Sequence, residues 1–211
     1  KKFADEQEDQ ELAAGRCEAT ANAFDPTKGP QWNGWSVDRS NSRFQPVDQA
    51  GLTPEQVSKL KVKWSFGFPP NTMVSQPTVV GGRIFVGTMR GRLYSIDAEK
   101  GCLYWSTKLP AGMRSAITIT ALPGSKPPRY VAYFGDVAAN ANAVDVKTGE
   151  RVWSTRLDSH SSARVTGAPV LHENLLYVPV ASFEEASGAD PKYPCCTFRG
   201  SVVALHAATG K

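Results

Sequence analysis

The sequence predicts an all-β protein: a partial β-propeller of about three four-stranded antiparallel blades, with a short N-terminal helix. Three observations support this fold class. The pattern D-x3-G-x3-W occurs at residues 97–105 and 145–153, and a third copy that begins at residue 206 stops at Lys211 before a tryptophan. Short apolar runs alternate with turns rich in glycine and proline, which number 18 and 15 of 211 residues. Charged residues make up only 21%, so a packed core is expected.

Three regions follow one another along the chain. Residues 1–29 are interpreted as an N-terminal tail and linker, residues 30–66 as a lead-in segment, and residues 67–211 as propeller blades truncated at the C-terminal end. The first eleven residues carry two basic and five acidic side chains. Such a charged end is typical of a solvated tail.

The lead-in segment contains a clear helix signal. Thr53 is suited to be the N-cap, Pro54 the first helical residue and Gln56 the partner in a capping box. We expect a short helix that ends near Leu60. Residues 60–66 then alternate as a strand and carry a tryptophan, which indicates the outer strand of a blade whose other strands lie elsewhere.

The first repeat reads as one complete blade, with Gly81-Gly82 as a hairpin turn between its first two strands. Aspartate and glycine of D-x3-G-x3-W would set the turn between the third and fourth strands. The indole at the outer strand would pack into the neighbouring blade, so the motif is structural and not catalytic. The expected strands are 78–80, 83–87, 92–97 and 103–107.

Closure of the propeller is the main difficulty. The chain supplies one outer strand, two full blades and a third blade that stops before its last strand. Propellers close with about four to eight blades, and an open arc leaves unpaired edges. We therefore expect a fragment, or one portion of a larger assembly.

Composition and motifs exclude several function classes. The net charge of +4, from 24 basic and 20 acidic residues, is too small to indicate nucleic-acid binding. No apolar run reaches the roughly 18 residues of a membrane span. The sequence contains no G-x-S-x-G, G-x-G-x-x-G or P-loop motif, and Leu176 stands where a zinc protease would need its second histidine after His172.

The four cysteines are Cys17, Cys102, Cys195 and Cys196. An even number is compatible with disulfides and an oxidising compartment, and equally with four reduced thiols. No C-x-x-C spacing occurs, which excludes a zinc ribbon, a thioredoxin-type site and a covalent haem site.

Several motifs resemble one family. They cover roughly residues 30 to 211, and the stretch CCTFRG at 195–200 is the most specific. The family is that of PQQ-dependent quinoprotein alcohol dehydrogenases, in the polyvinyl-alcohol-dehydrogenase-like branch (PQQ is pyrroloquinoline quinone). The matching stretches are Trp32–Trp35, Asn41–Pro46, Leu60–Gly67, Val165–Pro169 and Tyr193–Leu205.

The resemblance implies an eight-bladed propeller with PQQ and calcium on its axis, in a periplasmic or secreted protein. It implies oxidation of a primary or secondary alcohol, such as a polyvinyl-alcohol-like substrate, by hydride transfer to the quinone. Electrons would pass to a cytochrome c-type acceptor, and a haem domain would lie outside this chain or be absent. No catalytic residue is assigned here, because the general-base aspartate of the family belongs to later blades, beyond Lys211. The remaining blades, or another chain, would complete the propeller.

The resemblance also implies site residues. Arg114 would contact the carboxylates and carbonyls of the quinone, a task that suits a guanidinium fork. Thr166 would donate a hydrogen bond to the cofactor. Glu184 would be a calcium ligand, with Glu185 as the alternative. The competing interpretations are a solvated turn residue for Arg114, a strand hydroxyl that caps backbone for Thr166, and a pair of exposed glutamates.

For the cysteines, the resemblance implies a ring between Cys195 and Cys196 that contacts the quinone. In the family this ring comes just before the cofactor arginine, whereas here it follows Arg114 by about 80 residues. The ring would leave Cys17 and Cys102 to each other, and that bridge would tie the first segment to the first blade.

Two other functions stay open. A cofactor-free propeller scaffold would bind protein partners, and a repeat fragment would complete a propeller by pairing with another chain. The matches at several cofactor positions favour the dehydrogenase, because a scaffold has no need of them.

Overall fold

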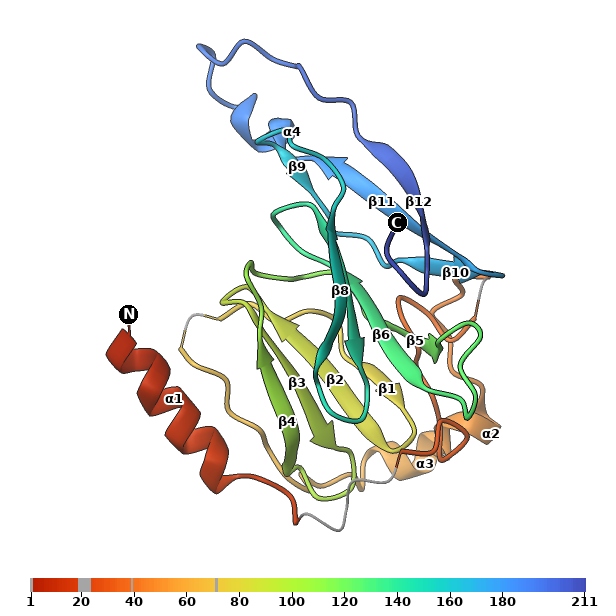
Figure 1. Cartoon of the computed structure of the whole chain (residues 1–211). Coiled ribbons are helices and arrows are strands. Elements are labelled where there is room, and N and C mark those ends of the chain that lie inside the picture. Colours follow the sequence, from red (N-terminus) through yellow and green to blue (C-terminus); the bar gives the residue numbers. More distant parts are fainter. Residues whose placement is uncertain (1, 19–23, 39, 71) are drawn as a thin grey trace.

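The computed structural model describes residues 2–18, 24–38, 40–70 and 72–211. Three four-stranded sheets follow one another along the chain (Figure 1). The predicted all-β partial propeller is confirmed. The first blade consists of β1 (Thr78–Val80), β2 (Arg83–Thr88), β3 (Arg92–Asp97) and β4 (Leu103–Lys108). The second consists of β5 (Thr118–Ala121), β6 (Tyr130–Gly135), β7 (Asn140–Asp145) and β8 (Arg151–Arg156).

The third sheet departs from this pattern. Its longest strand, β11 (Leu175–Ser182), pairs through its first three residues with β10 (Val170–His172) and through its last two with β9 (Ala163–Arg164). The remaining strand is β12 (Ser201–His206), which pairs with β11. Residues 165–169 therefore lie between two short strands that both contact β11.

Three of the four helices in the described residues have only four residues each, and the N-terminal one has 13. The predicted helix is confirmed as α3 (Pro54–Val57), with the Gln56 side chain accepting a hydrogen bond from the Thr53 N–H at 2.8 Å. It ends before Leu60 because the following N–H groups bond three residues back, in turns and not in an α-helix. The others are α1 (Lys2–Ala14), α2 (Val47–Ala50) and α4 (Glu184–Ser187); no described helix is long and apolar enough to cross a membrane.

One contact joins the blades: the tryptophan of D-x3-G-x3-W packs on the glycine of the next copy. Trp105 covers Gly149 and Trp153 covers Gly210, so closely that a Cβ on either glycine would lie 2.6–2.7 Å from the indole. Each indole N–H also donates to a carbonyl of the next blade at 2.9 Å, Val146 for Trp105 and Ala207 for Trp153. The predicted packing of the indole into the neighbouring blade is confirmed.

Residues 60–66 differ from expectation. They form no strand in the described chain, because none of its segments offers them a ladder of backbone hydrogen bonds. Trp64 nevertheless makes the repeated contact: it covers Gly101 of the first blade, and its N–H donates to the Ala98 carbonyl at 3.2 Å. The predicted strand is therefore wrong, although Trp64 packs on a blade glycine as the other repeat tryptophans do.

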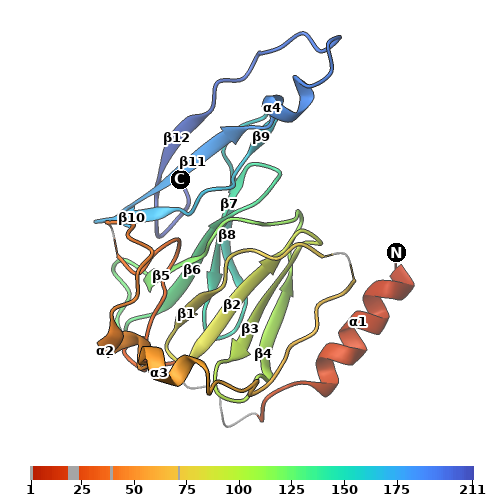
Figure 2. The same cartoon turned by 180° about the vertical axis from the view of Figure 1, so that it is seen from behind.

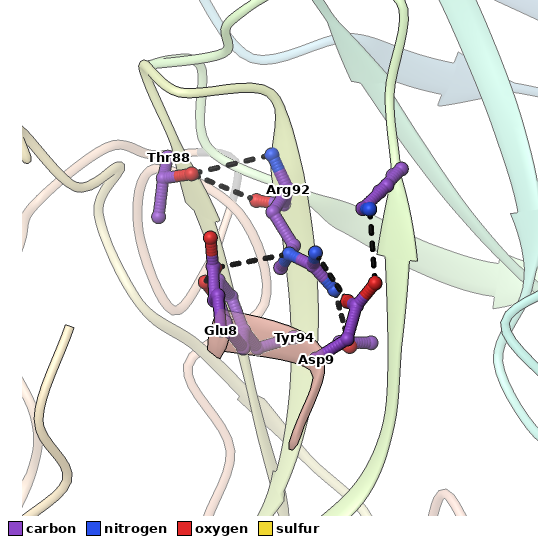
Figure 3. A network of polar contacts seen from close by, with 7 residues as sticks. Glu8, Asp9, Thr88, Arg92 and Tyr94 are labelled. Atoms are coloured by element: carbon purple, nitrogen blue, oxygen red, sulfur yellow. Dashed lines mark hydrogen bonds and ion pairs between the residues drawn. The ribbon is translucent and has the colours of Figure 1, made fainter. Parts of the chain in front are cut away.

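The first eleven residues are not a solvated tail, since most of them belong to α1. This helix flanks the first blade, on the side away from the third sheet (Figures 1 and 2). Glu8 and Asp9 form ion pairs with the buried Arg92 at 3.0 and 2.7 Å, and Asp9 also pairs with Lys108 (Figure 3). The buried Tyr94 hydroxyl donates to Glu8 at 2.8 Å. The acidic side chains thus satisfy polar groups of the first blade; residues 19–23 of the expected tail lie outside the described residues.

A disulfide between Cys17 and Cys102 ties the first segment to the turn between β3 and β4, as expected. Buried apolar clusters fill the two blade interfaces, one of them around Phe85, Trp105 and Phe134 and the other around Tyr133, Val165 and Val178. The blades are therefore held together by core packing as well as by the docked tryptophans.

The tryptophan contact predicts unequal effects for two glycines. Gly149 and Gly124 both have positive φ, 77° and 79°, but nothing lies within 4 Å of a Cβ at Gly124. Alanine at either position should lower the free energy of unfolding by about 1 kcal/mol, because the left-handed backbone is strained for a residue with a Cβ. Gly149→Ala should lose a further ~1–3 kcal/mol, because the methyl group overlaps Trp105. Urea denaturation measures both; equal losses would contradict the docking contact.

The turn aspartate predicts a pH effect. Burial alone would raise the pKa of Asp145, but hydrogen bonds from Arg129 and the N–H groups of Thr148 and Lys147 outweigh it and lower the pKa. A lowered folded-state pKa stabilises the fold above the unfolded value of about 3.9 and loses this effect as pH falls below it. Asp145→Asn should therefore lower the free energy of unfolding by about 1 kcal/mol at pH 7. The difference in stability between the two proteins should shrink below about pH 4, where Asp145 becomes protonated. Urea unfolding at several pH values tests this; a constant difference would oppose it.

Candidate functional site

Blade contacts place Arg114 and Thr166 at one end of the propeller. The N–H of Met113 donates to Thr88 at the end of β2, and the N–H of Val165 donates to Asp136 just after β6, both at 3.0 Å. In two successive blades, the segment that leads into the next blade thus donates a backbone hydrogen bond to the end of the second strand. Arg114 and Thr166 follow directly, so they occupy equivalent positions on adjacent blades.

Two glycines make room for the residues that precede this pair. A Cβ on Gly87 of β2 would overlap the Met113 side chain, and a Cβ on Gly135 of β6 would overlap Val165. Met113 and Val165 are fully buried. Because the buried side chain fixes the backbone, core packing determines where Arg114 and Thr166 emerge.

The two residues differ in their surroundings. Arg114 is exposed. Thr166 is partly buried and lines a cleft of about 830 Å³, together with Asn33 and Trp35 of the lead-in segment. Asn33 is fixed there by two hydrogen bonds with the backbone of Ile119 in β5, at 2.7 and 2.8 Å. A hydroxyl and a cation are therefore presented at the same end of two adjacent blades.

Glu184 is buried in α4, just after β11. Its Oε1 accepts hydrogen bonds from the Tyr193 hydroxyl at 2.9 Å and from the Thr197 N–H and hydroxyl at 2.8 and 3.1 Å. Its Oε2 accepts from the Phe198 N–H at 2.7 Å and the Ser182 hydroxyl at 3.4 Å. The backbone hydrogen bond from Thr197, with the other donors, lowers the pKa of Glu184 to about 2.

This donor set bears on the calcium prediction. A carboxylate offers about four lone-pair positions, and five hydrogen bonds already occupy those of Glu184. In this arrangement the carboxylate does not fit a calcium ion. Within the described residues, no group of three or more His, Cys, Asp or Glu side chains is placed to hold a metal ion. Glu185 is exposed.

Cys195 and Cys196 form a disulfide, on a loop between α4 and β12. Both cysteines are exposed, and Tyr193 and Thr197 on either side of them are bound to Glu184. β11, which leads into α4 and this loop, is the second strand along the main path of its sheet, so its end corresponds to the end of β6, where Val165 is bound. The structure thus brings Glu184 and the cysteine ring together, at the same end of the sheets as Arg114 and Thr166.

The sequence analysis missed a buried polar cluster on the second blade. The carboxylate of Asp136 accepts hydrogen bonds from the N–H of Ala138 and Asn140 and from the side chains of Asn140 and Asn142, at 2.9–3.2 Å. Because the Asp136 carbonyl receives Val165, this cluster supports the segment that carries Thr166. Two asparagines that alternate with alanines at the start of β7 were the available signal.

The residues between Gly87 and Arg114 yield a prediction. Gly87→Ala should destabilise the fold by about 1–3 kcal/mol through overlap with Met113. Met113→Ala should lower the free energy of unfolding by about 2–4 kcal/mol by leaving a cavity, yet it removes the three atoms nearest to a Cβ at Gly87. The double variant should therefore lose less than the sum by at least about 1 kcal/mol. A double-mutant cycle by urea denaturation measures this coupling, and strict additivity would refute it.

The chain is similar to known proteins in three comparisons. The family model described as "Outer membrane protein assembly factor BamB" matches residues 19–211. A polyvinylalcohol dehydrogenase of Pseudomonas sp. is 40% identical over 95% of this chain and 31% of its own length. A second one, of Sphingopyxis sp. (strain 113P3), is 36% identical over 95% of this chain and 30% of its own length.

Among solved structures, quinohemoprotein alcohol dehydrogenase from Comamonas testosteroni matches with a TM-score of 0.69 at 20% identity. That match covers 96% of this chain and 29% of that protein, and at this identity it supports the fold alone. The chain therefore spans about a third of the length of the relatives it matches.

Proposed function

The chain belongs to the PQQ-dependent quinoprotein alcohol dehydrogenase family, in its polyvinyl-alcohol-dehydrogenase-like branch, and on this premise we propose that it forms part of a quinone-binding alcohol dehydrogenase. The observation that carries the proposal is the equivalent placement of Arg114 and Thr166 on adjacent blades. The cysteine ring lies at the same end. The substrate would be a primary or secondary alcohol, polyvinyl-alcohol-like in the first instance.

The chemistry of these residues fits a planar, anionic quinone. The Arg114 guanidinium would donate paired hydrogen bonds to carboxylate or carbonyl oxygens, and its exposure leaves it open to a ligand. The Thr166 hydroxyl would donate from the wall of the cleft. The ring of Cys195 and Cys196 would offer a flat apolar face. When bound, PQQ supplies the acceptor for the hydride of the alcohol.

The proposal does not include a calcium ion at Glu184. The family resemblance predicts Glu184 as a calcium ligand, but five donors occupy its carboxylate, which in this arrangement does not fit the ion. Two disulfides support a periplasmic or secreted location, because such bonds persist in oxidising compartments. A cytochrome c-type electron acceptor and the other blades complete the proposal.

Quinone binding tests the proposal. PQQ titrated into the purified chain, with and without calcium, should quench tryptophan fluorescence and remain bound after desalting. Arg114→Ala should weaken binding about 10- to 100-fold, the effect of losing hydrogen bonds between charged groups. Thr166→Val should weaken it by less, about 3- to 10-fold.

A matched control is available in the same blade. Arg151 is also exposed, and it begins β8 at the opposite end of the sheet, so Arg151→Ala should leave PQQ binding unchanged. Equal losses in both arginine variants would mean nonspecific attraction of an anion. No binding by the unmodified chain would contradict a cofactor half-site on these blades alone. The scaffold function that the matching assembly-factor family suggests and a fragment that binds PQQ only with its other blades would then be separated by the mass of the native assembly.

A further inference from the structure

The loop that carries the cysteine ring is held on both sides. Tyr193 precedes the ring and Thr197 and Phe198 follow it, and all three donate hydrogen bonds to Glu184. Gly188 lies beneath, where a Cβ would be 3.6 Å from the Cys195 sulfur. One buried carboxylate therefore closes the base of the loop while the two cysteines stay exposed.

A histidine from another element reaches the same loop. His160 lies in the connection between β8 and β9, and its ring stacks on Phe198 with the centroids 5.0 Å apart and the planes at 16°. Its Nε2 lies 2.9 Å from the Thr197 hydroxyl, and its Nδ1 accepts a hydrogen bond from the Ser162 N–H at 3.0 Å.

These contacts fix the direction of the hydrogen bonds. Because Nδ1 accepts, the proton of the neutral imidazole is on Nε2, which donates to the Thr197 oxygen. The Thr197 hydroxyl has one hydrogen and donates it to Glu184 at 3.1 Å. His160, Thr197 and Glu184 thus form one chain in which every donor meets an acceptor.

The network also links neighbouring blades. The Ser162 carbonyl accepts a hydrogen bond from the Phe183 N–H at 2.8 Å, next to the pairing of β9 with β11. Phe198 packs against the buried cluster between the second and third blades. The loop is therefore fixed relative to the segment of residues 165–169, which carries Thr166.

We propose that His160, Thr197 and Glu184 are positioning residues that hold the Cys195–Cys196 loop, and that the Glu184 carboxylate serves this loop instead of a metal ion. The proposal rests on the proposed function only in what the ring faces, namely the quinone. The fixing of the loop by these hydrogen bonds is a property of this chain and can be measured without any cofactor.

Amide hydrogen exchange of the purified chain measures how firmly the loop is fixed, because the N–H groups of Thr197 and Phe198 donate directly to Glu184. Thr197→Val removes the hydroxyl and keeps the shape, so exchange at residue 198 should accelerate about 5- to 20-fold. His160→Phe keeps the stacking and should give a similar acceleration. The double variant should exceed neither single one by more than about twofold, because both break the same chain. Thr197→Ser retains the hydroxyl and should exchange like the original protein.

Three results would overturn the proposal. Unchanged exchange at residues 197 and 198 in both variants would mean that the network holds nothing. Equal acceleration at the N–H groups of Met113 and Val165, which bridge the blades, would mean global loosening. Added calcium should leave exchange at residue 198 unchanged; a calcium effect that Glu184→Gln abolishes would make the carboxylate a metal ligand. Each outcome is independent of PQQ binding, so failure here is distinct from failure of the proposed function.

Discussion

The architecture depends on one contact, an indole stacked on a glycine of the next blade. Trp105 approaches Gly149 so closely that any side chain at that glycine would collide with it. The indole N–H binds the neighbouring blade at the same time, so the contact specifies both distance and orientation. Since each blade repeats it, the spacing of the blades is set by a pair of residues that are far apart in sequence. Trp64 extends the series to a segment that forms no strand.

A second set of glycines fixes the position of the candidate site relative to the blades. Gly87 and Gly135 admit Met113 and Val165 from the following blade, and each of these is followed by a predicted cofactor residue. The buried residue needs a fixed place in the core, so the next residue emerges at a fixed place on the surface. The site is therefore an outcome of blade packing, and its residues need few contacts of their own.

Two buried charged side chains are each paired by groups from a neighbouring segment. Arg92 would be costly to bury alone, and α1 satisfies it with Glu8 and Asp9. Glu184 is likewise buried, and its carboxylate accepts four hydrogen bonds from the cysteine loop and one from the Ser182 hydroxyl of β11. In both cases a charged side chain inside the fold binds polar groups of a neighbouring segment and so helps to fix that segment in place. For Glu184 that segment is the cysteine loop.

The sequence by itself determined the repeat, the turn chemistry of Asp145, the capping box of α3 and the family resemblance, because these signals are local or recur at a fixed spacing. The resemblance also predicts Arg114, Thr166 and the adjacent cysteines as cofactor contacts. Only the tertiary structure decided that α1 docks on the first blade, that Glu184 is enclosed by donors, and that His160 reaches Thr197. The physical reason is the same in each case: these contacts join residues separated by many positions or on different elements, and no periodicity records which partner a buried charge will find.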